Sequence, residues 1–173
     1  MNANLNGYYK EIDRTMDKKD ELLALLKNQS VSVHTSEEAD FDYMENDDLA
    51  LVVKNPACEE DLQIELGAVF SLFFGLWHGQ YDAYNSDYER MKKDLAGILD
   101  GSFGAMAFYM GGKWNSSALC RQKLTAETDA AALLNSEDVP PETAEKLRAQ
   151  GGRIELLYWN PAENRTFEVP AGA

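Results

Sequence analysis

The sequence predicts an α+β fold: a largely antiparallel sheet of hairpins, with an N-terminal helix and a central amphipathic helix packed on it. Strand-like segments come in adjacent pairs separated by turn residues, which is typical of antiparallel hairpins. Helical periodicity appears between these pairs, and no strand–helix–strand rhythm recurs that would indicate a parallel sheet. A chain of 173 residues with 45% hydrophobic content suits a single domain over residues 1–173.

Residues 7–28 predict the N-terminal helix, because apolar residues recur there at helical spacing between Asp, Glu and Lys. The apolar stripe is interrupted at Lys19 and Asp20. We therefore expect residues 1–30 either to dock loosely or to pack on a partner. A short strand is expected next, at residues 31–33.

Strand patterns dominate from residue 49 onward. Residues 49–54 form an apolar, β-branched run that ends at Asn55-Pro56, and residues 61–65 alternate between apolar and polar. Residues 68–76 carry large apolar side chains on both faces, which suits a central strand or a tightly paired hairpin strand. The aromatic residues that follow are expected in the loop that leaves this strand.

The central helix is the clearest helix in the chain. Asn85 or Ser86 is its expected N-cap, and Gly101 follows its last turn. One face carries the apolar residues Tyr88, Met91, Leu95 and Ile98.

Two hairpins and two short helices are expected in the second half. Residues 103–110 and 113–120 predict a hairpin around Gly111-Gly112. Helices are expected at residues 125–134 and from Pro140-Pro141 to Gln150. A terminal hairpin is expected last, from residues 153–159 and 165–169 across Asn160-Pro161.

The net charge of −14, from 30 acids and 16 bases, disfavours nucleic acid and anionic membrane surfaces as partners, because both would repel the chain. A basic protein partner fits this charge better. The polar first thirty residues contain no apolar signal segment, so we expect a cytoplasmic protein. The longest apolar run, residues 66–77, is well short of the roughly 20 residues that a membrane-spanning helix needs.

An acidic segment at residues 37–48 holds seven acids and no base, half of the net charge. Aromatic and apolar side chains lie between the acids, so the segment can dock on a partner as well as repel one. The alternative is an ordinary solvated loop. The binding residues expected here are Phe41, Asp42, Tyr43, Glu45 and Asp47.

A second candidate site is the group Trp77, His78, Tyr81, Asp82 and Tyr84, at the end of the most apolar run. An imidazole near a carboxylate could act as a general base, so the catalytic alternative is His78 with Asp82. Trp114 would join this site if the two hairpins share one sheet. In the other interpretation, Trp77 and Tyr81 close the core and His78 is a hydrogen-bonded residue at its rim.

No motif for a metal, cofactor or nucleotide is present, and none of these ligands is expected. Cys58 and Cys120 form no CxxC pair, and the two histidines show no metal-binding spacing. The Gly111-Gly112-Lys113 run lacks the other residues of a phosphate-binding loop, and no GxSxG surrounds the serines. His34 is expected in a loop, Cys58 in an exposed turn and Cys120 in the core.

The segment FFGLWHGQYDAYNSDYERMKKDLAGIL, followed by GGKWNSSALC, resembles small bacterial α+β proteins. In these proteins a strand ends in a W-H-x-x-Y cluster and leads into an amphipathic helix. Some of them are similar to immunity proteins that neutralise bacterial toxins. The resemblance covers residues 62–120 and implies a protein partner.

These observations lead us to expect a small acidic cytoplasmic binding protein without chemistry of its own, an immunity or antitoxin-like inhibitor of a basic effector. One alternative is a ligand-binding or enzymatic domain with its site around His78, Asp82, Tyr81 and Trp114. Another is a self-associating scaffold that uses the N-terminal helix. The oligomeric state is left open.

Overall fold

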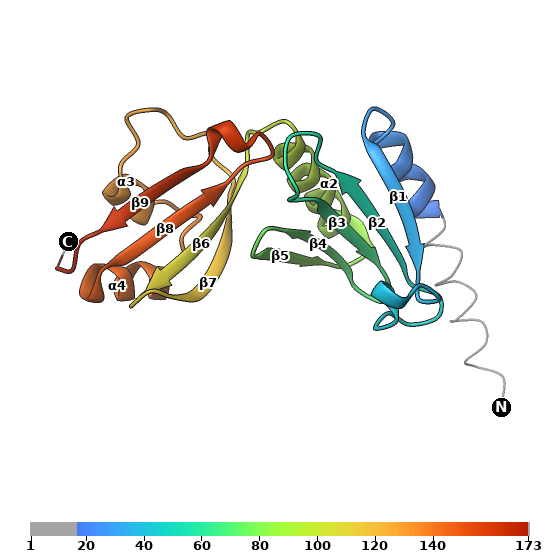
Figure 1. The fold of residues 1–173 in the computed structure, drawn as a ribbon, viewed down its shortest axis with the longest axis horizontal. Coiled ribbons are helices and arrows are strands. Elements are labelled where there is room, and N and C mark those ends of the chain that lie inside the picture. Colours follow the sequence, from blue (N-terminus) through green and yellow to red (C-terminus); the bar gives the residue numbers. More distant parts are fainter. Residues whose placement is uncertain (1–16, 173) are drawn as a thin grey trace. The chain divides into compact units, whose positions relative to one another are not determined.

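The computed structural model describes residues 17–172 and has four helices and two antiparallel sheets within this range, which confirms the α+β fold class. The first sheet has the order β1-β2-β3-β4-β5 and the second the order β7-β6-β8-β9 (Figure 1). The strands of the first sheet are β1 (Ser30–Thr35), β2 (Leu49–Lys54), β3 (Leu62–Leu66), β4 (Phe70–Phe74) and β5 (Trp77–Tyr81). Those of the second are β6 (Gly104–Met110), β7 (Lys113–Cys120), β8 (Gly152–Leu157) and β9 (Arg165–Val169).

The helices lie before, between and after these strands. Residues 17–25 are helical, and the longer helix α2 (Asn85–Leu99) follows β5. The remaining helices are α3 (Ala130–Leu134) and α4 (Pro141–Gln150), with short 3-10 turns η1 (Ala39–Phe41) and η2 (Pro161–Glu163). None of the helices within residues 17–172 is long and apolar enough to cross a membrane.

The contacts divide the chain into two compact units. Of the described residues, the first unit contains 17–73 and 79–89, and the second contains 74–78 and 90–172. That residues 1–173 fold as a single domain stays a prediction.

The first sheet has one apolar and one polar face. Val33 pairs with Leu51, and Leu51 pairs with Ile64, so these side chains share a face on which Leu51 and Ile64 are fully buried. The alternate residues of the same strands carry the opposite, polar face. Its polar side chains are Ser32, His34, Gln63 and Glu65.

The described part of the N-terminal helix is docked in the first unit. Leu22 is fully buried and Leu26 nearly so. The Lys18 ammonium lies 4.0 Å from the centre of the Tyr88 ring, which itself contacts Phe70 edge-on. Residues 7–16 of the predicted helix lie outside the described residues.

The strand predicted at residues 68–76 is shorter than expected, because the chain turns at Gly75-Leu76 and begins a fifth strand. Gly75 adopts a φ of +59°, which glycine tolerates and which allows a turn of two residues. The cluster that begins at Trp77 therefore lies mainly on a strand, and the expectation of an exit loop was wrong. Side chains alternate along β5, with Trp77 and Tyr81 buried and His78 exposed.

In the second unit, α3 and α4 cover one face of the sheet. Their side chains form a core with those of the central strands, in which Phe108, Leu133, Leu147 and Ile154 are fully buried. Cys120 belongs to the same core, as predicted.

The central helix buries the predicted apolar stripe, and its last turn closes on Phe103. The Phe103 amide donates a hydrogen bond to the Gly97 carbonyl at 2.8 Å. A Cβ atom at Gly97 would lie only 2.3 Å from the Phe103 ring. Glycine at this position therefore allows the ring to rest directly on the helix backbone.

The helix predicted at residues 125–134 begins only at Ala130. Asp129 caps it, because its carboxylate accepts a hydrogen bond from the Ala132 amide at 2.8 Å. The preceding residues form a separate turn in which the Thr125 amide donates to the Thr128 hydroxyl. The β6–β7 and β8–β9 hairpins, in contrast, have the predicted antiparallel pairing.

Candidate functional site

The acidic segment, residues 37–48, is ordered against the polar face of the first sheet. It connects β1 to β2 and contains the 3-10 turn η1. A chain of backbone hydrogen bonds shapes it, among them Phe41 N to Glu38 O and Met44 N to Phe41 O. The Met44 side chain is buried, so the segment has an apolar attachment to the unit.

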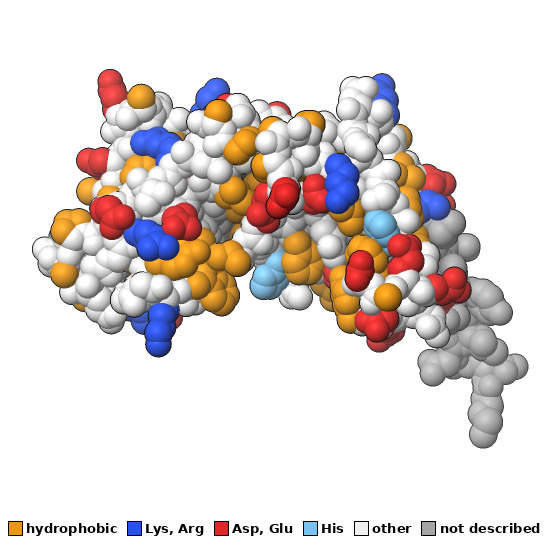
Figure 2. All heavy atoms as spheres, viewed as in Figure 1, with side chains coloured by type: hydrophobic (Ala, Val, Ile, Leu, Met, Phe, Trp, Pro, Cys, Tyr) orange, Lys and Arg blue, Asp and Glu red, His pale blue; other side chains and the backbone are white. Residues whose placement is uncertain are grey.

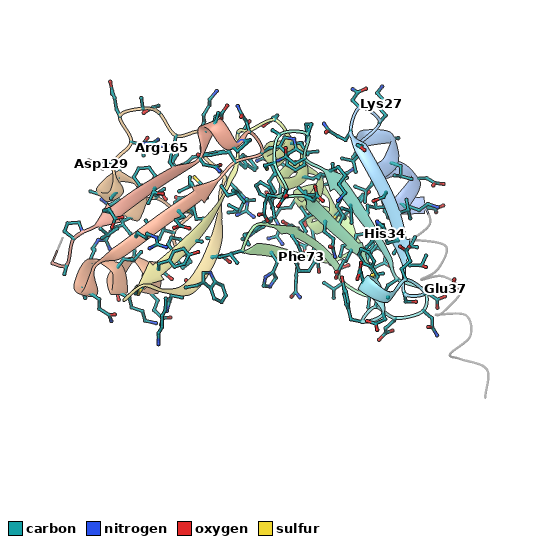
Figure 3. The ribbon with its side chains drawn as sticks, in the orientation of Figure 1. Lys27, His34, Glu37, Phe73, Asp129 and Arg165 are labelled. Carbon is teal, nitrogen blue, oxygen red and sulfur yellow. The ribbon has the colours of Figure 1, made fainter. Side chains whose placement is uncertain are left out.

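His34 anchors the start of this segment (Figure 3). Its Nδ1 lies 2.7 Å from a Glu38 carboxylate oxygen, and its Nε2 lies 2.7 Å from the Ser32 hydroxyl. The Phe41 ring stacks on the imidazole with a centroid distance of 4.4 Å and an interplanar angle of 15°. The hydrogen bond from His34 lowers the pKa of Glu38 below its ordinary value.

Tyr43 anchors the second half of the segment to β3. Its hydroxyl donates to a Glu65 carboxylate oxygen at 2.6 Å and accepts from the Gln63 amide at 2.9 Å. Burial and the hydrogen bond to Glu65 raise the pKa of Tyr43, so the phenol stays neutral. The residue nevertheless remains 61% exposed.

Asp48 ends the segment in a crowded position. A Cβ atom at Gly67 would lie 2.6 Å from a carboxylate oxygen of Asp48, so a larger residue there would force this carboxylate to move. One Asp48 oxygen accepts a hydrogen bond from the Glu45 amide. Partial burial, and then the negative charges of Glu45, Glu65 and Asp47, raise the pKa of Asp48.

The other carboxylates of the segment face solvent. Figure 2 shows acidic side chains gathered over this part of the first unit. The structure thus brings together the residues that the sequence predicted here, with Phe41 half-buried against His34 and Tyr43 exposed. The exposed acids are Glu37, Glu38, Asp40, Asp42, Glu45 and Asp47.

The residues of the second predicted site have different environments. Trp77 and Tyr81 are 6% and 2% exposed, so they contribute to packing, whereas His78 is exposed. Asp82 shapes the turn before α2, because its carboxylate accepts from the Tyr84 amide and its own amide donates to Asp87. A catalytic role for His78 and Asp82 stays a prediction.

Trp114 and Trp77 lie on different sheets. We expected Trp114 to join the second predicted site only if the two hairpins shared one sheet, and this condition is not met. Trp114 lies on β7 of the second sheet, opposite Tyr109 on β6, and is 52% exposed. The register shifts between Phe108 and Tyr109, where one strand has an extra residue.

Sequence reasoning missed the hydrogen-bonded chain Ser32–His34–Glu38, since it placed His34 in a loop. β1 extends to Thr35, so His34 lies on a strand. Ser32 and His34 are two residues apart, which places both side chains on one face once the strand is recognised. The alternation of Ser and Val in residues 30–33 was the signal for this longer strand.

A hydroxyl, an imidazole and a carboxylate in this order also activate serine nucleophiles in hydrolases, where donors for an oxyanion lie beside the hydroxyl. Ser32 lines neither of the two pockets described below. Because the Phe41 ring stacks on His34, we interpret the hydrogen-bonded residues Ser32, His34 and Glu38 as structural: they hold the acidic segment on the sheet. Within residues 17–172, no group of three or more His, Cys, Asp or Glu side chains is arranged to hold a metal ion.

Comparisons of the chain with protein-family models, with curated proteins and with solved structures find no match. The resemblance to immunity proteins therefore stays a prediction.

Proposed function

We propose that the protein is a small acidic binding protein whose acidic segment engages a basic protein partner. The observation that carries this proposal is the fixed conformation of the segment. His34 and Tyr43 hold it against the sheet, while six of its seven acidic residues, on both sides of Tyr43, are exposed.

Order distinguishes such a surface from a solvated acidic loop. A flexible loop loses conformational entropy when it binds, and this loss opposes association. Here the stack of Phe41 on His34 and the hydrogen bonds of Tyr43 have already restricted the backbone. A partner would therefore meet carboxylates whose positions are set before binding.

The surface also offers contact area in addition to charge. Tyr43 is an exposed residue, and aromatic side chains are frequent among the residues that dominate binding energy. Exposed acids around such a ring speed the encounter with an oppositely charged protein. This combination supports a protein partner rather than a small cation.

The finer form of the proposal is an immunity or antitoxin-like inhibitor of a basic effector. Effectors that act on nucleic acid need a basic substrate surface. The exposed carboxylates of the anchored segment, on a chain with a net charge of −14, would compete for that surface. In this form the chain acts by occupying the effector and needs no chemistry of its own.

The test uses the protein encoded beside this chain, because an immunity protein is expected next to its toxin. Calorimetric titration at low salt should show tight binding that weakens as salt is added. Reversing the charges of Asp42, Glu45 and Asp47 to Lys should weaken binding by about tenfold or more.

The matched control reverses three exposed acids of the second unit, Glu127, Glu137 and Glu145. Both triple variants change the net charge equally, so a difference in their affinities would show that the location of the acids matters and not only the total charge. Equal affinities for the two variants would contradict the proposal, as would the absence of binding by the neighbouring protein.

A further inference from the structure

A pocket of about 380 Å³ opens in the second unit, where the loop after β7 meets the β8–β9 connection. Its volume lies within the range of pockets that hold small molecules. The charged and polar side chains in its wall come from segments far apart in the sequence. The wall includes Lys123, Leu124, Thr125, Tyr158, Glu163 and Arg165.

Arg165 is held in place at this pocket. Its guanidinium donates hydrogen bonds of 2.8 Å to the carbonyls of Thr125 and Thr128, so it also secures the loop (Figure 3). The same group lies 4.6 Å from the centre of the Phe167 ring. A ligand would therefore meet a cation whose position is already set.

Lys123 supplies a second positive charge to the wall, and its side chain is exposed. Within residues 17–172, neither Lys123 nor Arg165 forms an ion pair with a carboxylate. This is notable in a chain with 30 acids and only 16 bases. Two unneutralised cations in one pocket favour an anionic group.

Tyr158 adds a neutral hydrogen-bonding group. The residue is 5% exposed, and its hydroxyl makes no hydrogen bond to the described part of the chain. The ring packs against the backbone of Gly104, where a Cβ atom would lie 2.8 Å from it. Burial raises the pKa of Tyr158 to about 12, so the phenol remains a donor at neutral pH.

Glu163 gives the same pocket a negative charge. One of its oxygens accepts a hydrogen bond from the Asn160 amide at 3.3 Å. A simple polyanion such as phosphate would be repelled by this carboxylate. A molecule with a carboxylate and a nearby amino or hydroxyl group offers an anion to the two cations and a hydrogen-bond donor to Glu163.

We propose that this pocket binds a small amino acid or hydroxy acid, with the carboxylate held by Lys123 and Arg165 and the amino or hydroxyl group held by Glu163. The apolar wall at Leu124 would contact the rest of the ligand. This site lies in the second unit and involves no residue of the acidic segment, so it is independent of the proposed protein partner.

The second pocket of this unit supports the assignment by contrast. It has a similar volume of about 380 Å³ and contains Arg148. Its guanidinium is hydrogen-bonded, as that of Arg165 is, and donates to the Leu134 carbonyl and the Asn135 side chain at 3.0 and 2.8 Å. The two pockets differ in the rest of the wall. That of the second pocket is otherwise mostly apolar, so it lacks the two cations of the first pocket.

The test is an NMR titration of the full chain with serine, leucine, glutamate and lactate, and separately with acetate and inorganic phosphate. At least one of the four acids should cause saturable shifts in the amide signals of residues 123–126 and 162–165. Acetate and phosphate should bind about tenfold more weakly or worse, because acetate offers no donor to Glu163 and phosphate is repelled by that carboxylate. No saturable shift with any of the four acids, or equal binding of acetate or phosphate, would overturn the proposal.

Variants test the assignment of the groups. Lys123→Gln and Glu163→Gln should each weaken the binding of the acid that shifts these signals by about tenfold. Lys113→Gln removes an exposed lysine outside the pocket and should leave binding unchanged. Unchanged binding in both pocket variants, with spectra that show folded protein, would also refute the site.

Discussion

Asp94 and Arg121 form a bidentate ion pair that joins α2 to the end of β7 in the second unit. Arg121 Nε and Nη2 donate to the two Asp94 carboxylate oxygens at 2.8 and 2.7 Å. The Asp94 side chain is 1% exposed, whereas that of Arg121 is 42% exposed. The Arg121 amide also donates to Asp138 at 2.9 Å, so this arginine links three segments of the unit.

We expect Arg121→Met to destabilise the protein by about 3–5 kcal/mol, because it removes the bidentate ion pair from the buried Asp94 carboxylate. Urea denaturation should show this as a lower midpoint with an unchanged slope. The control is the exposed pair of Lys146 and Glu142, where Lys146→Met should cost less than about 1 kcal/mol. Similar losses in the two variants would show that the burial of Asp94 has no energetic consequence.

Asp48 should make the first unit less stable at neutral pH than an uncharged residue would. Its pKa is raised above the ordinary 3.8, so folding favours the protonated carboxyl. The resulting penalty is complete above the folded pKa and disappears as the pH falls through that value to below 3.8. Asp48→Asn should therefore raise stability at pH 7, by less than about 1 kcal/mol because solvent screens this partly buried group.

The pH dependence of stability distinguishes the penalty at Asp48 from the effect of removing any negative charge. Stability measured by urea denaturation should differ between Asp48→Asn and the parent chain at pH 7, and the two should converge in acid. Asp42→Asn removes a charge from the same segment at an exposed position and should show a smaller gain. A destabilised Asp48→Asn protein at pH 7 would contradict the explanation.

Local patterns predicted most of the fold. The apolar stripe of α2, the Gly111-Gly112 turn and the segment that follows Pro140 are each encoded within a few residues, and the structure has all three. The division into two sheets is not local. It depends on which hairpins pair over long distances, and alternating patterns alone do not specify a partner strand.

The candidate site was predictable in composition and not in geometry. Acids and aromatics in residues 37–48 indicated a binding surface, but the anchors of that surface lie outside the segment, at His34 and Glu65. A contact between a loop and a strand has no characteristic residue spacing, so a single sequence does not predict it. The prediction of a loop at Trp77 was wrong for a related reason. Gly75 has a positive φ and allows a tight turn, so the residues after it form β5.

His34→Ala should release the acidic segment without unfolding the first unit. The change removes the stack on Phe41 and the hydrogen bond to Glu38, so amide protons of residues 38–44 should exchange with solvent about tenfold faster. Acid should have a similar effect on the parent chain. The lowered pKa of Glu38 means that its contribution is complete above the ordinary 4.5 and is lost as the pH falls through the folded value. His78→Ala, at the only other histidine, is the control and should leave exchange unchanged; equal protection in both variants would contradict the anchor.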